Sequence, residues 1–519
     1  MSAVSASAVS ALVTRLERLG DWFNPIVVKE VRQALKSRQF VGTFLLLLLG
    51  AWAGSIFGVS YLGASIDYGS PAVTFYAGFL FALCAASLVI VPFSTFRSIV
   101  EERTETTLEL LQITALSPVQ IVRGKTLSAM VQVLVYYCAI APFIAFTALL
   151  PGFDVVHVAF SLVMLLIAAL CFSIIALAIG AHARKATLQA LSSLVVIAMA
   201  FGGMMAFFSF MTAAGEGIRF DESDTWWGLA LFVFLGLSTA YVCEQGAVAQ
   251  LTFDSDNRST RIRLASGGQW FLCWTGLLTF LVVRLRPMPS DTETAILTLT
   301  ATYITVAGLF FVSEPDTLSR RVSRGLPRSR ALRVLWAPFL PGGARGLLFA
   351  LVSLVVLDGF VTVLFPQLTL TNIFTNRQTT QYAIALAAYS LIYLGAGTLL
   401  ARLLRRVMPG VYSFHVLAFL GLANLLLIVA AEVIHFLSGP PVPTPLLIDV
   451  VNPVVTLRGI ADADRGSVDA LACLVVGAGV AIAANVRALW RGVSDIVNDP
   501  VRAQIESQPQ PAGIVYRRV

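Results

Sequence analysis

Residues 101–125 read EERTETTLELLQITALSPVQIVRGK and interrupt an otherwise apolar part of the chain. The apolar runs on either side, 72–93 and 126–150, are each long enough to cross the roughly 30 Å hydrocarbon core of a bilayer as a helix. A polar, acid-rich segment between two such runs is typical of a loop that joins transmembrane helices. This stretch therefore indicates the fold class, and the rest of the chain repeats its pattern.

The composition excludes an ordinary soluble protein. Of 519 residues, 57% are hydrophobic and 13% are charged, and the mean hydropathy is +0.82. A soluble domain carries about twice this charged fraction. Strands of a membrane barrel would instead alternate in segments of about ten residues. We predict an all-α polytopic membrane protein with about 12 transmembrane helices, at residues 40–63, 72–93, 126–150, 156–181, 187–213, 226–251, 269–286, 294–312, 346–366, 380–401, 411–437 and 468–487.

The positive charges set the orientation. With the N-terminus inside, 30 of the 36 lysines and arginines fall in cytoplasmic segments, as the positive-inside rule requires. Both termini are therefore predicted to be cytoplasmic, in a multi-pass protein of the plasma (bacterial inner) membrane. The net charge of +7 is explained by this distribution, so no nucleic acid partner is predicted and the lipid bilayer is the expected surroundings.

The same reading divides the chain into four parts. Two polar ends flank two membrane regions, and each membrane region contains one long cytoplasmic segment. The predicted parts are an N-terminal segment 1–39, a membrane region 40–251 with a cytoplasmic hairpin 94–125, a second membrane region 252–487 with a basic loop 313–345, and a tail 488–519.

A short amphipathic helix is predicted before the first span. Asn24 is a good N-cap and Pro25 suits the first helical position. Apolar residues between Ile26 and Leu35 share one face, and Lys29 and Arg32 lie towards the other. This pattern favours a helix along the inner leaflet. The alternative is a basic flank that only orients the first span.

The hairpin is predicted to contain two helices. Glu102, Glu105 and Glu109 share a helix face by their spacing, and Leu111 lies on a neighbouring face. The pair Ser117-Pro118 then supplies an N-cap and a first-turn proline for a second, short helix that feeds the third span. A polar hairpin that meets only solvent is the alternative to one that meets a partner.

Together these elements resemble the ABC-2 type permease subunits of ATP-binding-cassette transporters. The resemblance covers roughly residues 20–180, although Thr106 stands where the family often has glycine. It is carried by an Asn-Pro helix, two spans and a Glu-rich helix that ends in TLELL-x-x-T-x-LSP-x-x-I-x-x-GK. The matching residues are Asn24, Pro25, Lys29, Glu30, Arg32, Glu101, Glu102, Thr107, Leu108, Glu109, Leu110, Leu111, Thr114, Leu116, Ser117, Pro118, Ile121, Gly124 and Lys125.

The resemblance implies roles for these residues. In the family the hairpin lies against the nucleotide-binding subunit and transmits its closure to the membrane helices. The residues expected to couple the ATPase are Glu101, Glu102, Glu105, Glu109, Leu111, Ser117, Pro118 and Lys125, and those expected in the connecting helix are Asn24, Pro25, Lys29, Glu30 and Arg32.

No nucleotide site is predicted in this chain. Gly124-Lys125-Thr126 mimics the end of a phosphate loop, but the position that must be glycine is Val119, and a helix precedes it. ATP and Mg²⁺ are therefore expected in a separate P-loop ATPase subunit, and no cofactor or metal in this one. Its six cysteines and four histidines are scattered, and no catalytic constellation is recognisable, so the chain is not expected to be an enzyme.

Three acidic residues are predicted at membrane depth: Glu244, Asp358 and Glu432. Ionisable groups there are costly and become functional candidates by default. An ion-gradient-driven carrier would use such groups. The alternative is that each carboxylate is paired with a polar neighbour or lies near the interface.

The most basic cytoplasmic segment is 313–345. It contains Arg320, Arg321, Arg324, Arg328, Arg330, Arg333 and Arg345. These residues either meet anionic lipid headgroups or only orient the flanking helices.

We therefore expect the permease subunit of an ABC transporter, an exporter that works as a homo- or heterodimer of permeases. The alternatives are an ion-gradient-driven secondary transporter and a non-transporting membrane partner of an ATPase.

Overall fold

The computed structural model describes most of the chain, and the described residues form helices and no strand, as predicted for the fold class. The described ranges are 25–62, 71–104, 116–152, 154–183, 185–217, 222–253, 256–284, 290–316, 318–327, 329–369, 377–407, 413–437, 450–461 and 467–498.

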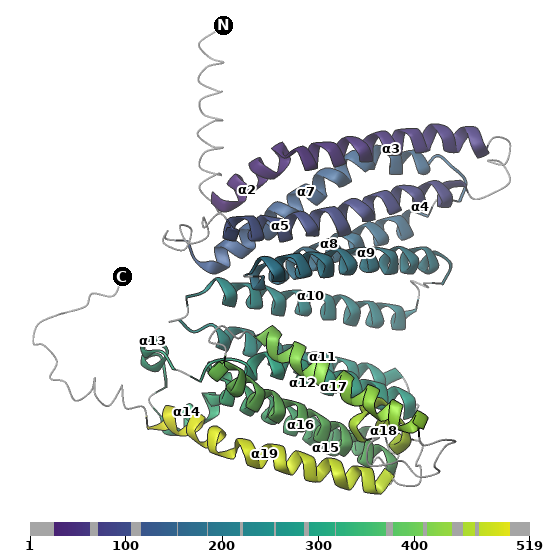
Figure 1. The fold of residues 1–519 in the computed structure, drawn as a ribbon. Helices are drawn as coiled ribbons and strands as arrows, with labels where there is room; N and C mark the ends of the chain where they lie inside the picture. The colour runs from purple at the N-terminus through teal and green to yellow at the C-terminus, as the bar shows by residue number, and fades with distance from the viewer. Residues whose placement is uncertain are drawn as a thin grey trace, which may run out of the picture. The chain divides into compact units, whose positions relative to one another are not determined.

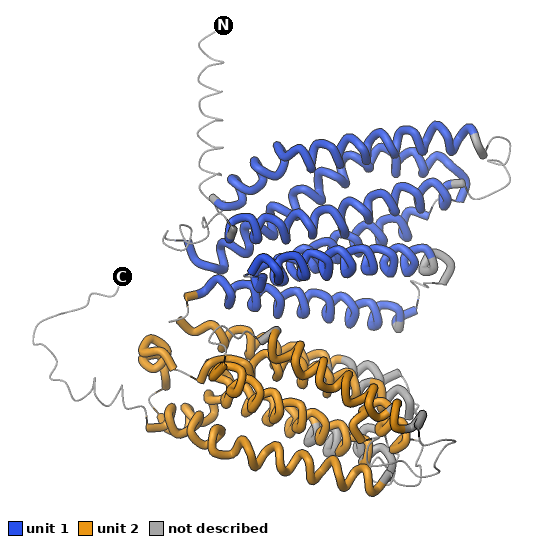
Figure 2. Tube along the Cα trace, in the orientation of Figure 1, with its two compact units in different colours: residues 1–252 blue, residues 253–519 orange. Residues whose placement is uncertain are grey.

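The chain forms two compact units, Met1–Thr252 and Phe253–Val519 (Figure 2). Unit 1 is a bundle of long helices preceded by one short amphipathic helix (Figure 1). Its elements are α2 (Pro25–Lys36), α3 (Arg38–Leu62), α4 (Pro71–Cys84), the π-helix η2 (Ala85–Ile90), α5 (Val91–Thr104), α7 (Pro118–Thr147), α8 (Val155–His182), α9 (Ala186–Gly217) and α10 (Ser223–Leu251).

Unit 2 combines long helices with short ones at their ends (Figure 1). Its long helices are α11 (Ser259–Arg284), α12 (Ser290–Val312), α15 (Gly343–Thr369), α16 (Arg377–Val407), α17 (Ser413–Leu437) and α19 (Ser467–Val497). Its short ones are α13 (Arg320–Arg324), α14 (Arg330–Trp336), the 3₁₀-helix η3 (Ala337–Phe339) and α18 (Pro453–Ala461).

Within the described ranges, 8 helices are long and apolar enough to cross a membrane. Six lie in unit 1 and two, in α16 and α19, lie in unit 2. The number of spans rises to 9 if a bent pair of helices, Arg330–Phe339 with Gly343–Leu357, is counted as one span. Two further apolar helices, Leu297–Val312 and His415–Ala431, are shorter than these spans. These helices support a multi-pass membrane protein. Each predicted span of unit 2 falls on a helix.

The helices that flank the hairpin differ from the prediction in length. The second predicted span ends at residue 93, but α4, η2 and α5 run on without a break to Thr104. After the hairpin, Ser117 is the N-cap of α7, as predicted. Its hydroxyl accepts a hydrogen bond from the backbone N–H of Gln120, and the side chain of Gln120 accepts one from the backbone N–H of Ser117. The predicted short second helix is wrong, because α7 continues from Pro118 to Thr147.

The core of unit 1 forms where α4, α7 and α8 meet. Leu83, Leu88, Ile140 and Leu165 are fully buried there, and Tyr136 is nearly so. Because lipid is as apolar as these side chains, close packing rather than transfer from water holds the helices together. The Tyr136 hydroxyl lies 2.7 Å from the hydroxyl of Thr43 on α3, which satisfies both groups.

Gly346 provides a test of the packing in unit 2. A Cβ added to it would lie 2.5 Å from the backbone carbonyl carbon and oxygen of Phe311 on α12. Because backbone atoms cannot move aside cheaply, we expect Gly346→Ala to cost about 1–3 kcal/mol. The midpoint of thermal unfolding in detergent should fall by several degrees. Gly421→Ala in α17, with nothing within 4 Å, should not lower it. Equal shifts in both variants would contradict this packing.

Candidate functional site

Lys125 of α7 is the centre of an ion network that joins three helices. Its Nζ lies 3.0 Å from Glu102 Oε1 on α5 and 3.1 Å from Glu30 Oε1 on α2. Nζ also donates to Ser98 Oγ on α5 at 3.4 Å. The side chain of Lys125 is only 2% exposed. We call Lys29, Glu30, Ser98, Glu102 and Lys125 the Lys125 network.

The charges of the Lys125 network balance. Lys29 Nζ lies 3.7 Å from Glu102 Oε1 and 4.0 Å from Glu30 Oε1. Two ammonium groups therefore face two carboxylates. The side chain of Lys29 is 58% exposed and those of both glutamates are 13% exposed. The Lys29 end of the network therefore faces solvent, and the Lys125 end is buried. A cation as buried as Lys125 is tolerated only with such partners.

An apolar cluster lies on the same helices as the Lys125 network and on two more. It gathers residues of five helices, α2, α5, α7, α8 and α10: Ile26, Ile99, Ile121, Val122, Leu177, Ala178, Ala181, Ala247, Val248 and Leu251. Close contact between α5 and α8 requires Gly180, where a Cβ would come within 2.5 Å of Ile99 Cγ2. In these surroundings the effective dielectric is low and ion pairs are strong. The arrangement holds the ends of these helices together as one body.

Glu244 of α10 is paired at the same end of unit 1. Its Oε1 accepts from Arg123 Nε at 2.7 Å, and its side chain is 13% exposed. Because Arg123 lies two residues before Lys125 on α7, this pair ties α10 to the helix that carries the network centre. The structure therefore gives Glu244 the polar partner that was the alternative to an isolated intramembrane carboxylate.

The other predicted site residues are placed as follows. Glu101 is exposed and pairs with Arg97 one turn earlier, at 2.7 Å. Arg32 is exposed, and Pro25 begins α2. Ser117 and Pro118 begin α7. Residues Asn24, Glu105, Glu109 and Leu111, and the side chains of Asp358 and Glu432, lie outside what the structure describes.

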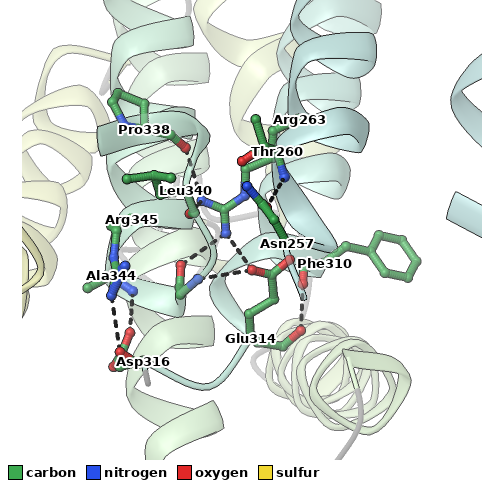
Figure 3. A network of polar contacts seen from close by, with 12 residues as sticks. Asn257, Thr260, Arg263, Phe310, Glu314, Asp316, Pro338, Leu340, Ala344 and Arg345 are labelled. Atoms are coloured by element: carbon green, nitrogen blue, oxygen red, sulfur yellow. Dashed lines mark hydrogen bonds and ion pairs between the residues drawn. The ribbon is translucent and has the colours of Figure 1, made fainter. Parts of the chain in front are cut away.

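A second polar network lies in unit 2, around Arg263 of α11 (Figure 3). Its side chain is fully buried, and Nη2 donates to Glu314 Oε2 at 2.7 Å and to the Gly342 carbonyl at 3.0 Å. Nη1 donates to the carbonyls of Pro338 at 3.0 Å and Leu340 at 2.5 Å. Burial lowers the pKa of the Arg263 guanidinium, and the nearby Glu314 carboxylate acts in the opposite direction. The guanidinium thus satisfies the carbonyls of the turn between η3 and α15.

Asp316 and Arg345 extend this network to the start of α15. Asp316 Oδ1 accepts from the Ala344 backbone at 2.8 Å, and the Asp316 carbonyl accepts from Arg345 Nη2 at 3.1 Å. Sequence reasoning missed this site: it did not single out Arg263, and it grouped Arg345 with the arginines that either meet lipid headgroups or orient the flanking helices. The headgroup interpretation is wrong for Arg345, because its side chain is buried. The available signal was the presence of two acids, Glu314 and Asp316, at the start of the most basic segment, 313–345.

Comparisons with known proteins identify no relative: no family model, no curated protein and no solved structure matches the chain. Among the residues that the structure describes, no three or more histidine, cysteine or acidic side chains gather as metal ligands.

Replacing Lys125 tests the network. In Lys125→Met, two carboxylates that are each 13% exposed lose their shared buried cation, and breaking a buried ion pair costs about 3–5 kcal/mol. We expect the unfolding midpoint of the solubilised protein to fall by roughly 5 °C or more.

The matched control is Arg97→Gln, which breaks the exposed pair with Glu101 and should cost less than about 1 kcal/mol. If both variants melted at the same temperature, Lys125 would not be a stabilising centre.

Proposed function

We propose that the chain is the membrane-spanning permease subunit of an ABC-2 type ATP-binding-cassette transporter, working as an exporter in the plasma membrane. One observation carries the proposal. The residues that carry the sequence resemblance on α2, α5 and α7 include Lys29, Glu30, Glu102 and Lys125, and these four meet in one ion network. Residues far apart in the sequence thus interact in one ion network at one end of unit 1.

The proposed mechanism uses this network as a mechanical joint. A separate P-loop subunit that binds ATP and Mg²⁺ would dock on the hairpin between α5 and α7. Because Lys125 binds carboxylates of both α5 and α2, a push on the hairpin moves the ends of α2, α5 and α7 together. The π-helix η2, directly before α5, is a place where the long helix can yield, since π-helical turns are often found at functional sites.

The proposal assigns different roles to neighbouring glutamates. Glu102 is held inside the Lys125 network, so its contribution is to position α5. Glu101 is 56% exposed on the same helix and is available to a docking partner. Lys125 contributes by holding α2 to the hairpin helices, not by contact with a nucleotide.

The proposed topology has about 12 spans with both termini in the cytoplasm, and it places the Lys125 network on the cytoplasmic side. Support comes from the six membrane-length helices of unit 1 and from the six long helices of unit 2. The substrate path would run between membrane helices at the interface of two permease protomers, in a homo- or heterodimer.

Site-specific photo-crosslinking tests the proposal. A benzophenone amino acid at Glu101, in native membranes, is expected to crosslink to a polypeptide that contains a P-loop, identified by mass spectrometry. The control position is Trp227, exposed near the start of α10 and about 30 Å along the helix from its network end.

A P-loop ATPase captured at Glu101 and not at Trp227 supports the proposal. No ATPase at Glu101, or equal capture at both positions, would overturn it. If instead Glu244→Gln abolished transport that persists without ATP, an ion-gradient-driven carrier would replace the proposed transporter.

A further inference from the structure

The short helix α14, with η3, meets the long helix α15 at 90°. It has seven residues, about 10 Å of helix, so it is too short to cross a bilayer. If α15 crosses the membrane, α14 lies parallel to the membrane plane. Figure 1 places α14 at the end of unit 2 where α19 ends.

The right angle between α14 and α15 is built into the fold. The fully buried Arg263 binds the carbonyls of Pro338, Leu340 and Gly342, which form the turn between η3 and α15. Gly342 has φ +132°, a conformation that side chains with a Cβ rarely adopt. Its N–H donates to Glu314 Oε2 at 3.1 Å. These bonds hold α14 in a fixed direction.

One face of α14 presents apolar side chains. Leu332, Leu335 and Trp336 are 54%, 70% and 38% exposed, and their spacing puts them on one side of the helix. Arg333 faces the protein instead: its Nε donates to the Pro327 carbonyl at 2.7 Å, and its Nη1 to the Val497 carbonyl at the end of α19 at 3.3 Å. Arg333 is thus anchored to the protein, and Leu332, Leu335 and Trp336 face outward.

Exposed positive charge lies close to this apolar face. Helix α13 packs with the α14 end in one apolar cluster, through Val322 and Ala337. Arg320, Arg324 and Arg330 are exposed on these two helices. Three acids near these helices, Glu314, Asp316 and Asp256, are already bonded to Arg263, to the Ala344 backbone and to Arg321. A fourth acid, Asp495 of α19, is close enough to Arg345 to interact with it electrostatically.

We propose that α13 and α14 form a binding surface for anionic phospholipid in the leaflet at this end of unit 2. Leu332, Leu335 and Trp336 lie at the boundary of headgroups and acyl chains, where tryptophan is favoured. Arg320, Arg324 and Arg330 bind the lipid phosphates, which match the geometry of guanidinium groups. The 90° angle favours lipid over a soluble partner, because it lays the axis of α14 along the membrane surface if α15 crosses the bilayer.

Fluorescence quenching by brominated lipids tests this surface. The full chain is reconstituted in phosphatidylcholine vesicles that contain about a tenth phosphatidylglycerol. Two samples are compared: one contains brominated phosphatidylglycerol, and the other contains brominated phosphatidylcholine at the same mole fraction. The fluorescence of Trp336 is obtained by subtracting the emission of the Trp336→Phe variant from that of the wild type. We expect brominated phosphatidylglycerol to quench Trp336 more than brominated phosphatidylcholine. The triple variant Arg320→Gln, Arg324→Gln, Arg330→Gln should lose this preference about tenfold or more.

The matched control removes equal charge from unit 1, at the exposed residues Arg32, Lys36 and Arg38, each changed to glutamine. This control should keep the lipid preference at Trp336. The proposal fails if neither lipid quenches Trp336, if both quench it equally in wild type, or if the control loses the preference as the triple variant does. Size-exclusion profiles and melting curves check that each variant is folded.

Discussion

A lysine side chain that is 2% exposed must keep its positive charge among carboxylates, and this constraint on Lys125 governs the end of unit 1. Glu30 and Glu102 come from different helices, so the pairing brings α2 and α5 to α7. Buried ion pairs add little net stability compared with apolar residues of equal volume. We interpret their use here as specifying one arrangement of the three helices, which is what a mechanical joint needs.

Unit 2 satisfies a related constraint with different chemistry. Where α12, η3 and α15 meet, a turn leaves backbone carbonyls without helical partners. The buried guanidinium of Arg263 binds three of these carbonyls and Glu314. Arginine suits this position because its planar group offers several donors in fixed directions. In both units a buried cation near the helix ends binds groups from several elements of the bundle.

Much of unit 1 could be predicted from the sequence, because long apolar runs and caps are local signals. The Ser117 cap was predicted from the pair Ser117-Pro118 and is confirmed, and all six predicted spans of this unit fall on helices. The unbroken helix from Pro118 to Thr147 was missed, since it depends on burial between neighbours. The pairing of Lys125 with Glu30, 95 residues away, and the burial of Arg263 depend on tertiary contacts that no spacing rule reveals.

The central claim, that Lys125 binds α2 to the hairpin helices, is tested most directly by a double-mutant cycle. Lys125→Met, Glu30→Gln and the combined variant are compared with wild type by chemical denaturation in detergent. We predict that the second substitution costs less once the first is present, with a coupling of about 0.5–3 kcal/mol. Additive effects, with no coupling between Lys125 and Glu30, would contradict the account.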